Sequence, residues 1–292
     1  MILLIGGDAK LSGELISVFK KNNVKYCATS RRKNLKINFI YLDLNKVDDF
    51  KIPPNISKVI FVGGVTDYKL CEKEPEYAEF INCNQIPKLA SKMIQMNIPV
   101  YFISTNTVFT NDKGMPNEYD NHNPSSSYSK LKSVTEKNLY KFTPKDLHNN
   151  ISIIRLTKNI NLFTEPFYDW IKDLKKNKLI YPFKDLFFSP VLFNNSANAI
   201  FKIVFNNYKG NFHFSGEKDF SYDQFAYLLV KKLGFDKDLV SPILSAQKNV
   251  KLIYNNNITA LNMEITSKST GLKPVMIEEI IKYFADNYEK IN

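Results

Sequence analysis

The chain has 292 residues, 44% of them hydrophobic and 24% charged, which is the composition of a globular protein with one or two domains. The formal net charge is +11, but the lysines are spread along the chain and only Arg31, Arg32 and Arg155 are arginines, so nucleic acid is not the expected partner. An anionic small ligand accounts for the charge equally well. The three cysteines form no Cys-x-x-Cys pair, which excludes a cysteine zinc site and favours a reducing cytoplasm.

No apolar run approaches the roughly 20 residues that a membrane-spanning helix needs. The opening run, Met1–Ile5, has no basic stretch before it and no small-residue cleavage site after it. We therefore expect no membrane insertion, no secretory signal and a cytoplasmic location.

Short apolar strands alternate with helical stretches through the first half of the chain. Since parallel strands are covered by helices on both faces, this alternation predicts an α/β fold with a doubly wound parallel sheet of the Rossmann type. Its ligand crevice would lie beyond the carboxyl ends of the strands. The predicted strands are Ile2–Ile5, Val24–Ala28, Phe39–Leu42, Lys58–Val62, Pro99–Ile103 and Ile151–Leu156, and the predicted helices are Leu11–Asn22, Pro75–Gln95 and Lys130–Tyr140.

The second half loses this rhythm. Residues 159–188 are aromatic and interrupted by proline, and isolated helices are expected at Tyr222–Leu233 and Ile277–Tyr288. We predict a dinucleotide-binding domain of residues 1–158, rejoined by roughly 189–215, and a smaller α/β substrate domain of residues 159–188 and 216–292. The last helix is either solvent-exposed surface or the contact of a homodimer.

The turn after the first strand runs Gly6-Gly7-Asp8-Ala9-Lys10-Leu11-Ser12. A dinucleotide fingerprint places glycines where the backbone approaches a pyrophosphate, and here the three positions are Gly6, Ala9 and Ser12. All three residues are small, but only one is glycine. An ordinary glycine turn accounts for the segment as well.

The second strand is followed by Thr29-Ser30-Arg31-Arg32. At this point of a dinucleotide-binding domain an acid binds the ribose 2′-OH, whereas an arginine accepts a 2′-phosphate. Two hydroxyls and two arginines with no carboxylate favour NADP(H) over NAD(H). The alternative is a solvated surface loop.

A tyrosine and a lysine four residues apart, Tyr128 and Lys132, open the predicted helix that follows Ile103-Ser104-Thr105. Such a pair shares one helix face, and the ammonium can lower the phenol pKa, which makes the tyrosine a usable acid or base. The same spacing recurs at Tyr168/Lys172 and Tyr227/Lys231, so spacing alone does not select a pair. Only the first follows a strand that ends in hydroxyl residues.

Together these residues resemble the extended short-chain dehydrogenase/reductase superfamily and, within it, the dTDP-4-dehydrorhamnose reductase family. The chain departs from that family at Ala9, Ser12, Lys69 and Asn106, where the family usually has glycine or an acid, and in the loop between Asn159 and Ser189. The matching segments follow one another in the family's order: Gly63–Glu72, Asn82, Ile103–Thr105, Val108-Phe109, Arg155, Phe188–Val191, His213–Gly216 and Gly271–Pro274.

The resemblance implies an NADPH-dependent reductase of a nucleotide-activated 4-keto-6-deoxysugar, in surface polysaccharide or deoxysugar biosynthesis. Tyr128 would protonate the developing alkoxide, Lys132 would hold the nicotinamide ribose and Thr105 would hydrogen-bond the substrate oxygen. With these, the resemblance assigns cofactor contacts to Gly6, Asp8, Ala9, Lys10, Leu11, Ser30, Arg31, Arg32, Asp43, Leu44, Gly63, Gly64, Thr66, Tyr128 and Lys132, and substrate contacts to Thr105, Asn106, Thr107, Val108 and Arg155. The isolated histidines indicate no metal site.

Two alternatives stay open. One is a sugar-nucleotide epimerase or dehydratase that keeps its NAD bound. The other is a non-catalytic regulatory or binding protein on the same fold, since the family includes a regulatory subunit of methionine adenosyltransferase and a fold does not fix a function.

Overall fold

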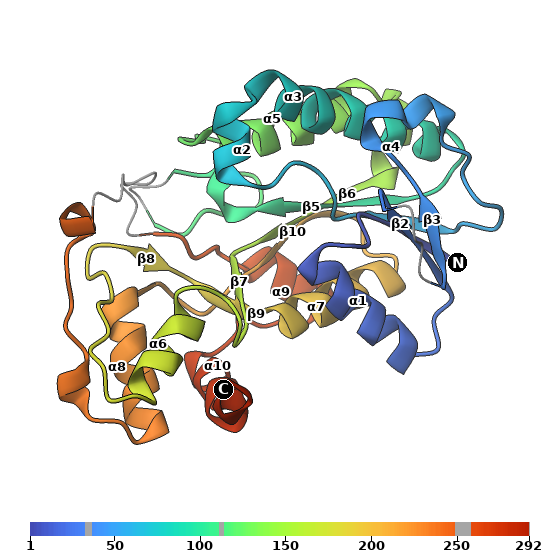
Figure 1. Cartoon of the computed structure of the whole chain (residues 1–292). Helices are drawn as coiled ribbons and strands as arrows, with labels where there is room; N and C mark the ends of the chain where they lie inside the picture. The colour runs from blue at the N-terminus through green and yellow to red at the C-terminus, as the bar shows by residue number, and fades with distance from the viewer. Residues whose placement is uncertain (33–36, 111–113, 249–257, 292) are drawn as a thin grey trace.

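The computed structural model describes residues 1–32, 37–110, 114–248 and 258–291. Within them, a parallel sheet of seven strands forms the centre of the molecule (Figure 1). The doubly wound sheet predicted from the alternating pattern is confirmed. Its spatial order is β10 (Gly210–Phe214), β6 (Ile151–Leu156), β5 (Val100–Thr105), β4 (Lys58–Phe61), β1 (Ile2–Ile5), β2 (Tyr26–Ser30) and β3 (Phe39–Tyr41).

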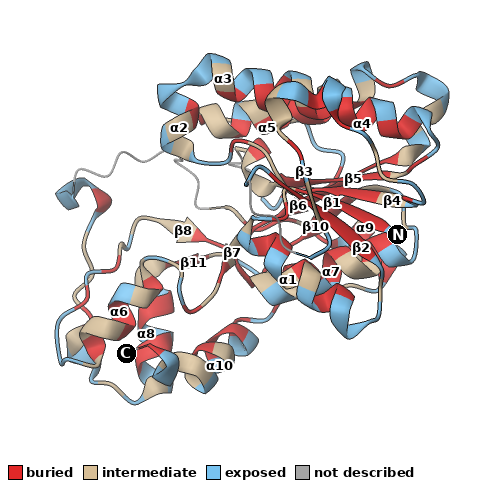
Figure 2. Ribbon diagram, turned by 45° about the vertical axis from the view of Figure 1, so that its right-hand side comes forward, coloured by how far each residue is buried: buried red, intermediate tan, exposed pale blue. Residues whose placement is uncertain are grey.

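Helices cover both faces of the sheet, and the strand alternation decides which core each side chain joins. Leu4 packs in one core with Leu15 of α1 (Lys10–Lys21), whereas its neighbour Leu3 packs in the other core with Leu89 of α4 (Ile86–Gln95). Figure 2 shows the buried residues concentrated in the strands between the two helical layers. One layer contains α1 (Lys10–Lys21), α7 (Phe193–Phe205) and α9 (Glu264–Thr270), and the other contains α2 (Tyr68–Lys73), α3 (Pro75–Glu79), α4 (Ile86–Gln95) and α5 (Ser127–Lys141).

The segment predicted as one helix, residues 75–95, forms three consecutive helical elements. Between α3 and α4 the chain makes a π-helical turn, η2 (Phe80–Gln85), whose extra residue per turn changes the direction of its side chains. Asn82 points from this turn to Val65, receiving a hydrogen bond from the Val65 amide at 2.9 Å and donating one to the Val65 carbonyl at 2.8 Å. The turn thereby fixes the loop after β4.

Three helices form a lobe at one end of the molecule (Figures 1 and 2): α6 (Phe167–Leu174), α8 (Tyr222–Leu233) and α10 (Ile277–Asn287). Phe167 lies at their centre, with ring-centroid distances of 4.8 Å to Phe225 and 5.8 Å to Phe284. The apolar face of α10 is therefore buried within the chain. Two small sheets join the lobe to the main sheet: β7 (Lys158–Ile160) pairs with β9 (Pro190–Leu192), and β8 (Phe187–Phe188) with β11 (Phe220–Ser221).

In the part of the chain that the structure describes, no helix has the length and apolar character required to span a lipid bilayer.

Candidate active site

Two adjoining cavities lie at the carboxyl ends of the central strands, where the sequence predicts a crevice. The larger, of about 660 Å³, and the smaller, of about 400 Å³, share Ala9 and Thr66. Of the predicted cofactor residues, the larger cavity is lined by Gly6, Asp8, Ala9, Ser30, Arg31, Asp43, Leu44, Gly63, Gly64 and Thr66, and the smaller by Ala9, Lys10, Leu11, Thr66, Tyr128 and Lys132.

The turn between β1 and α1 has the tight geometry of a phosphate-binding loop. Gly6 has a φ of +90°, and a Cβ on it would lie 2.3 Å from the Cα of Gly63, so no other residue fits there. Ser12 replaces the third fingerprint glycine without loss of the turn, because its hydroxyl donates to the Gly6 carbonyl at 2.7 Å. Ala9 caps α1 without a side-chain hydrogen bond, which leaves the first amides of the helix for an anionic group.

The end of β2 carries a carboxylate that its own sequence does not show. Asp8, from the preceding turn, accepts a hydrogen bond from the Ser30 hydroxyl at 2.6 Å, and its other oxygen lies 3.7 Å from Nε of Arg32. The segment that follows β2 contains no acidic residue, as the sequence indicates. The site nevertheless has a carboxylate, which comes from Asp8. Arg32 is largely exposed and does not line either cavity, whereas Arg31 does.

Thr105, Tyr128 and Lys132 line the smaller cavity together. Thr105 ends β5, while the other two lie in the first two turns of α5, which begins at Ser127, directly after its capping residue Ser126. Lys132 is buried, donates from Nζ to the Ile103 carbonyl at 2.9 Å and lies 4.4 Å from the Phe102 ring centroid. Burial lowers the pKa of its ammonium to about 8. The position after a strand that ends in hydroxyl residues therefore identified the Tyr-Lys pair that lines a cavity. The pairs Tyr168/Lys172 and Tyr227/Lys231 lie on α6 and α8.

A chain of hydroxyl groups ties Thr105 to the start of α5. Oγ1 of Thr105 lies 3.2 Å from Oγ1 of Thr107, which accepts a hydrogen bond from Ser129 at 2.8 Å. The Ser129 hydroxyl is 2.6 Å from that of Ser126. The strand end and the helix that carries Tyr128 are therefore held in one hydrogen-bonded unit.

Four predicted substrate residues lie outside the lining of the two cavities. Thr107 belongs to the hydroxyl chain, and Asn106 donates to the Thr259 carbonyl at 2.7 Å. Val108 is fully buried, in a small cluster with Phe109 and Leu261. Arg155 is 3% exposed and its guanidinium is occupied inside the fold by Glu136.

The sequence did not single out three polar residues that line the smaller cavity: Ser104, Thr157 and Asn159. Among the residues that the structure describes, Oγ of Ser104, Oγ1 of Thr157 and Oδ1 of Asn159 are buried with no hydrogen-bond partner. Buried polar atoms usually have partners, so these three enclosed oxygens are exceptions beside the cavity. Their position at or just past the ends of β5 and β6 was the signal available in the sequence.

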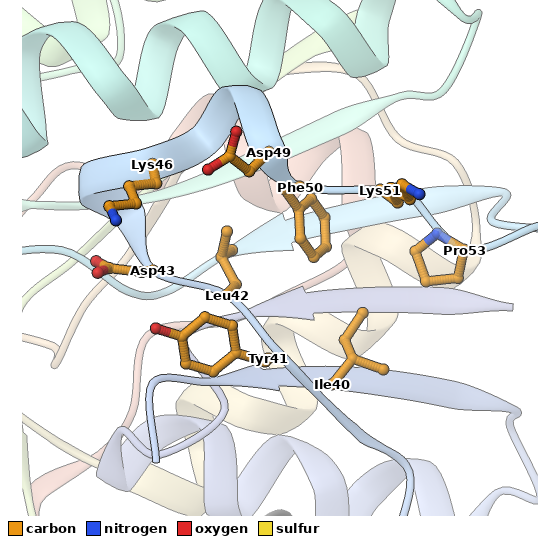
Figure 3. Close-up of a pocket in the computed structure, with 9 residues that line it drawn as sticks. All are labelled: Ile40, Tyr41, Leu42, Asp43, Lys46, Asp49, Phe50, Lys51 and Pro53. Carbon is orange, nitrogen blue, oxygen red and sulfur yellow. The ribbon is translucent and has the colours of Figure 1, made fainter. Parts of the chain in front are cut away.

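A third hollow, of about 360 Å³, adjoins the larger cavity at Leu42 and Asp43 and lies between β3 and the 3-10 helix η1 (Leu44–Asp49). Figure 3 shows the polar ends of Tyr41, Asp43 and Lys46 gathered on one side of it, with Phe50 and Pro53 on the other. The Asn45 backbone amide holds the pKa of the Asp43 carboxyl below its usual range, and the Arg31 cation adds to the effect. Asp43 is therefore ionised where the two hollows meet.

Comparisons with known proteins agree with this architecture. The dTDP-4-dehydrorhamnose reductase of Clostridium acetobutylicum is 22% identical, with 97% of this chain and 98% of that chain covered and a TM-score of 0.77. The Bacillus anthracis enzyme of the same name, solved with NADP, is 20% identical over 97% of each chain, with a TM-score of 0.80. A dTDP-glucose 4,6-dehydratase of B. anthracis, solved with NAD, is 13% identical over 99% of this chain and 96% of that one, with a TM-score of 0.75.

At these identities the likeness establishes the fold. Comparison with curated proteins by sequence gave no match. The family described as the RmlD substrate binding domain, however, matches residues 1–290. The resemblance found in the sequence is confirmed, and the chain belongs to the RmlD substrate binding domain family, with the extended short-chain dehydrogenase/reductase fold.

Proposed function

We propose that this protein is an NADP(H)-dependent reductase of a nucleotide-activated 4-keto-6-deoxysugar, acting in cytoplasmic deoxysugar or surface polysaccharide biosynthesis. One observation carries the proposal: a threonine, a tyrosine and a buried lysine line one cavity, and the adjoining glycine-turn cavity shares Ala9 and Thr66 with it. A proton donor, a cation and a hydroxyl beside a dinucleotide site are the groups that carbonyl reduction needs.

The residues of the two cavities fit a dinucleotide. Gly6 and Gly63, which pack against each other, both line the larger cavity, and the uncapped start of α1 supplies amide donors for a pyrophosphate. When bound, the nicotinamide supplies the hydride.

The side chains of the smaller cavity then have distinct tasks. Tyr128 delivers a proton to the substrate oxygen as negative charge develops there, and the Lys132 ammonium stabilises the negative charge left on the phenol. Thr105 donates a hydrogen bond to the same substrate oxygen, in place of the one that its hydroxyl donates to Oδ1 of Asn106 at 3.2 Å. Stabilisation that grows with the developing charge is what lowers the barrier.

We also propose that the lobe of α6, α8 and α10, with the segments 159–188 and 216–292 to which it belongs, holds the sugar nucleotide. Asn159, the first residue of these segments, lines the smaller cavity, so this part of the chain begins beside Thr105 and Tyr128. Residues 1–158 with roughly 189–215 would then hold the cofactor.

The test is NADPH oxidation with a dTDP-4-keto-6-deoxysugar, measured for wild type, Tyr128→Phe and Tyr227→Phe. The control removes a hydroxyl from a tyrosine with the same spacing to a lysine, but on α8, where its side chain is 42% exposed. We expect Tyr128→Phe to lose about 10²-fold or more in kcat while the control retains activity. Full activity in Tyr128→Phe would refute the assigned role, and no turnover by wild type with any nucleotide sugar would favour a non-catalytic protein.

A second candidate is an epimerase or dehydratase that keeps NAD bound through each cycle. The carboxylate of Asp8 beside Ser30 favours it, because an acid at this position suits a free ribose 2′-OH. Mass spectrometry of the purified protein separates the two. NAD at full occupancy indicates the second candidate, and an exchangeable dinucleotide indicates the reductase.

A further inference from the structure

The position of Asp8 is fixed by the fold rather than by a flexible loop. The Gly6 amide donates to the Thr29 hydroxyl at 3.0 Å, and the Gly7 amide donates to the Thr29 carbonyl at 2.8 Å. A Cβ on Gly7 would lie 2.8 Å from that of Ala28, so the turn is pressed against β2. Asp8 follows directly and points to the end of that strand.

At the end of β2, hydrogen bonds hold the Asp8 carboxylate in place. The Ser30 hydroxyl donates to Oδ2 of Asp8 at 2.6 Å and accepts from the Arg32 amide at 3.0 Å. The Asp8 side chain is 30% exposed, so its charge is only partly screened by solvent. A negative charge therefore stands where the adenosine ribose of a dinucleotide lies in this fold.

Each arginine of this region has a carboxylate near it. Nε of Arg32 is 3.7 Å from Asp8, and Arg31 lines the larger cavity with Asp43, whose pKa its charge lowers. Asp67 and Glu74 line the same cavity. A 2′-phosphate entering here gains less from the arginines than their sequence position indicates, because it also meets negative charge.

We propose that Asp8 is a specificity-determining residue that sets the ratio of NADPH to NADH affinity in this protein. Its carboxylate accepts a hydrogen bond from a free ribose 2′-OH and repels a 2′-phosphate, while Arg31 and Arg32 attract the phosphate. The inference deepens the proposed function and rests on its dinucleotide site, but not on the identity of the sugar. We therefore expect wild type to prefer NADPH over NADH only weakly.

The experiment measures dissociation constants by calorimetry for NADPH and NADH, and for 2′-phospho-ADP-ribose and ADP-ribose, which lack the nicotinamide. It compares wild type, Asp8→Asn and Asp8→Glu, with unfolding curves to confirm that each variant is folded. The matched control is Asp48→Asn, which makes the same change in net charge at a side chain that is 73% exposed, pairs with Lys88 and lies outside the larger cavity.

In Asp8→Asn we expect the affinity for the phosphorylated ligand, divided by that for the unphosphorylated one, to rise by about tenfold in both ligand pairs. The rise should be smaller at high salt, because salt screens the charges. Asp8→Glu and Asp48→Asn should stay within about twofold of wild type. An unchanged ratio in Asp8→Asn, or an equal rise in Asp48→Asn, would overturn the inference while leaving the proposed function in place. If wild type binds none of the four ligands, the proposed function fails with it.

Discussion

Glu136 and Arg155 form an ion pair that is almost fully removed from solvent, with 2.7 Å between Oε2 and Nη2 and side-chain exposures of 3% and 4%. The same guanidinium donates to the Glu118 carbonyl at 3.0 Å and lies 3.2 Å from Nε2 of His213. Glu136 is one helical turn beyond Lys132 on α5, and Arg155 lies on β6. The pair therefore anchors the helix that carries Tyr128 to the strand beside it.

Removing the carboxylate should be costly, because the arginine would remain buried without its partner. We expect Glu136→Gln to lower the free energy of unfolding by about 3–5 kcal/mol, measured by urea denaturation. The double variant Glu136→Met/Arg155→Met, which removes both charges, should be more stable than the single one. A loss below about 1 kcal/mol in Glu136→Gln would show that the pair contributes little.

His213 should make the protein sensitive to moderate acid. Burial, with the Arg155 cation next to it, lowers its pKa to about 3, so the folded state keeps this ring neutral while the unfolded chain protonates near pH 6.5. The unfolded state then binds more protons between these values, and stability falls as the pH falls through that window. The expected loss from this group is about 2 kcal/mol between pH 7 and pH 5.

Urea denaturation of His213→Gln against wild type isolates that contribution, since glutamine keeps both a donor and an acceptor but does not titrate. The difference in unfolding free energy between the two proteins should change by this amount over the window. Parallel curves for wild type and His213→Gln would contradict the assignment.

Much of the fold could be predicted, because each central strand is an apolar run covered on both faces, a pattern that short windows of sequence contain. The π-helical turn at Asn82 could not, since it depends on the hydrogen bonds that this side chain makes with Val65, 17 residues away. The helix α2 was not predicted either, because it is six residues long and Cys71 is its one buried residue, so its sequence has no helical apolar pattern.

The candidate site, too, was predictable in part. Thr105, Tyr128 and Lys132 were identifiable because strand ends and helix starts meet at one edge of a parallel sheet. The Asp8 carboxylate was missed at the ribose position because it reaches Ser30 from 22 residues away. For Arg155, the end of a strand indicated the edge of the crevice, but the face to which the side chain points follows from register and packing.

Two glycines near the site should respond in opposite ways to alanine. Gly6→Ala forces a Cβ against the Gly63 backbone at a φ of +90°. We therefore expect the free energy of unfolding to fall by about 2–4 kcal/mol and dinucleotide binding to be lost. Gly13 lies inside α1 with nothing within 4 Å of an added Cβ, so Gly13→Ala should stabilise by about 0.5–1 kcal/mol. Urea denaturation and dinucleotide titration measure both effects. A stable Gly6→Ala variant that still binds would contradict the tight-turn interpretation.

The depressed pKa of Lys132 leads to a prediction in alkali. Its ammonium loses its proton at about pH 8 in the folded state but near pH 10.5 in the unfolded chain, because burial disfavours the charge. Between these values the unfolded state binds more protons, so the contribution of this group to stability rises with pH. Relative to Lys132→Met, which does not titrate, wild type should gain up to about 3 kcal/mol in unfolding free energy between pH 8 and pH 10.5. Urea denaturation of both proteins across this range gives the difference, and titrations shared by the two cancel. Loss of the same proton should lower catalytic activity, because a neutral amine no longer stabilises negative charge on Tyr128. We therefore expect kcat/KM to fall above about pH 8. A constant stability difference, or a kcat/KM that stays level to pH 10, would show that Lys132 keeps its proton.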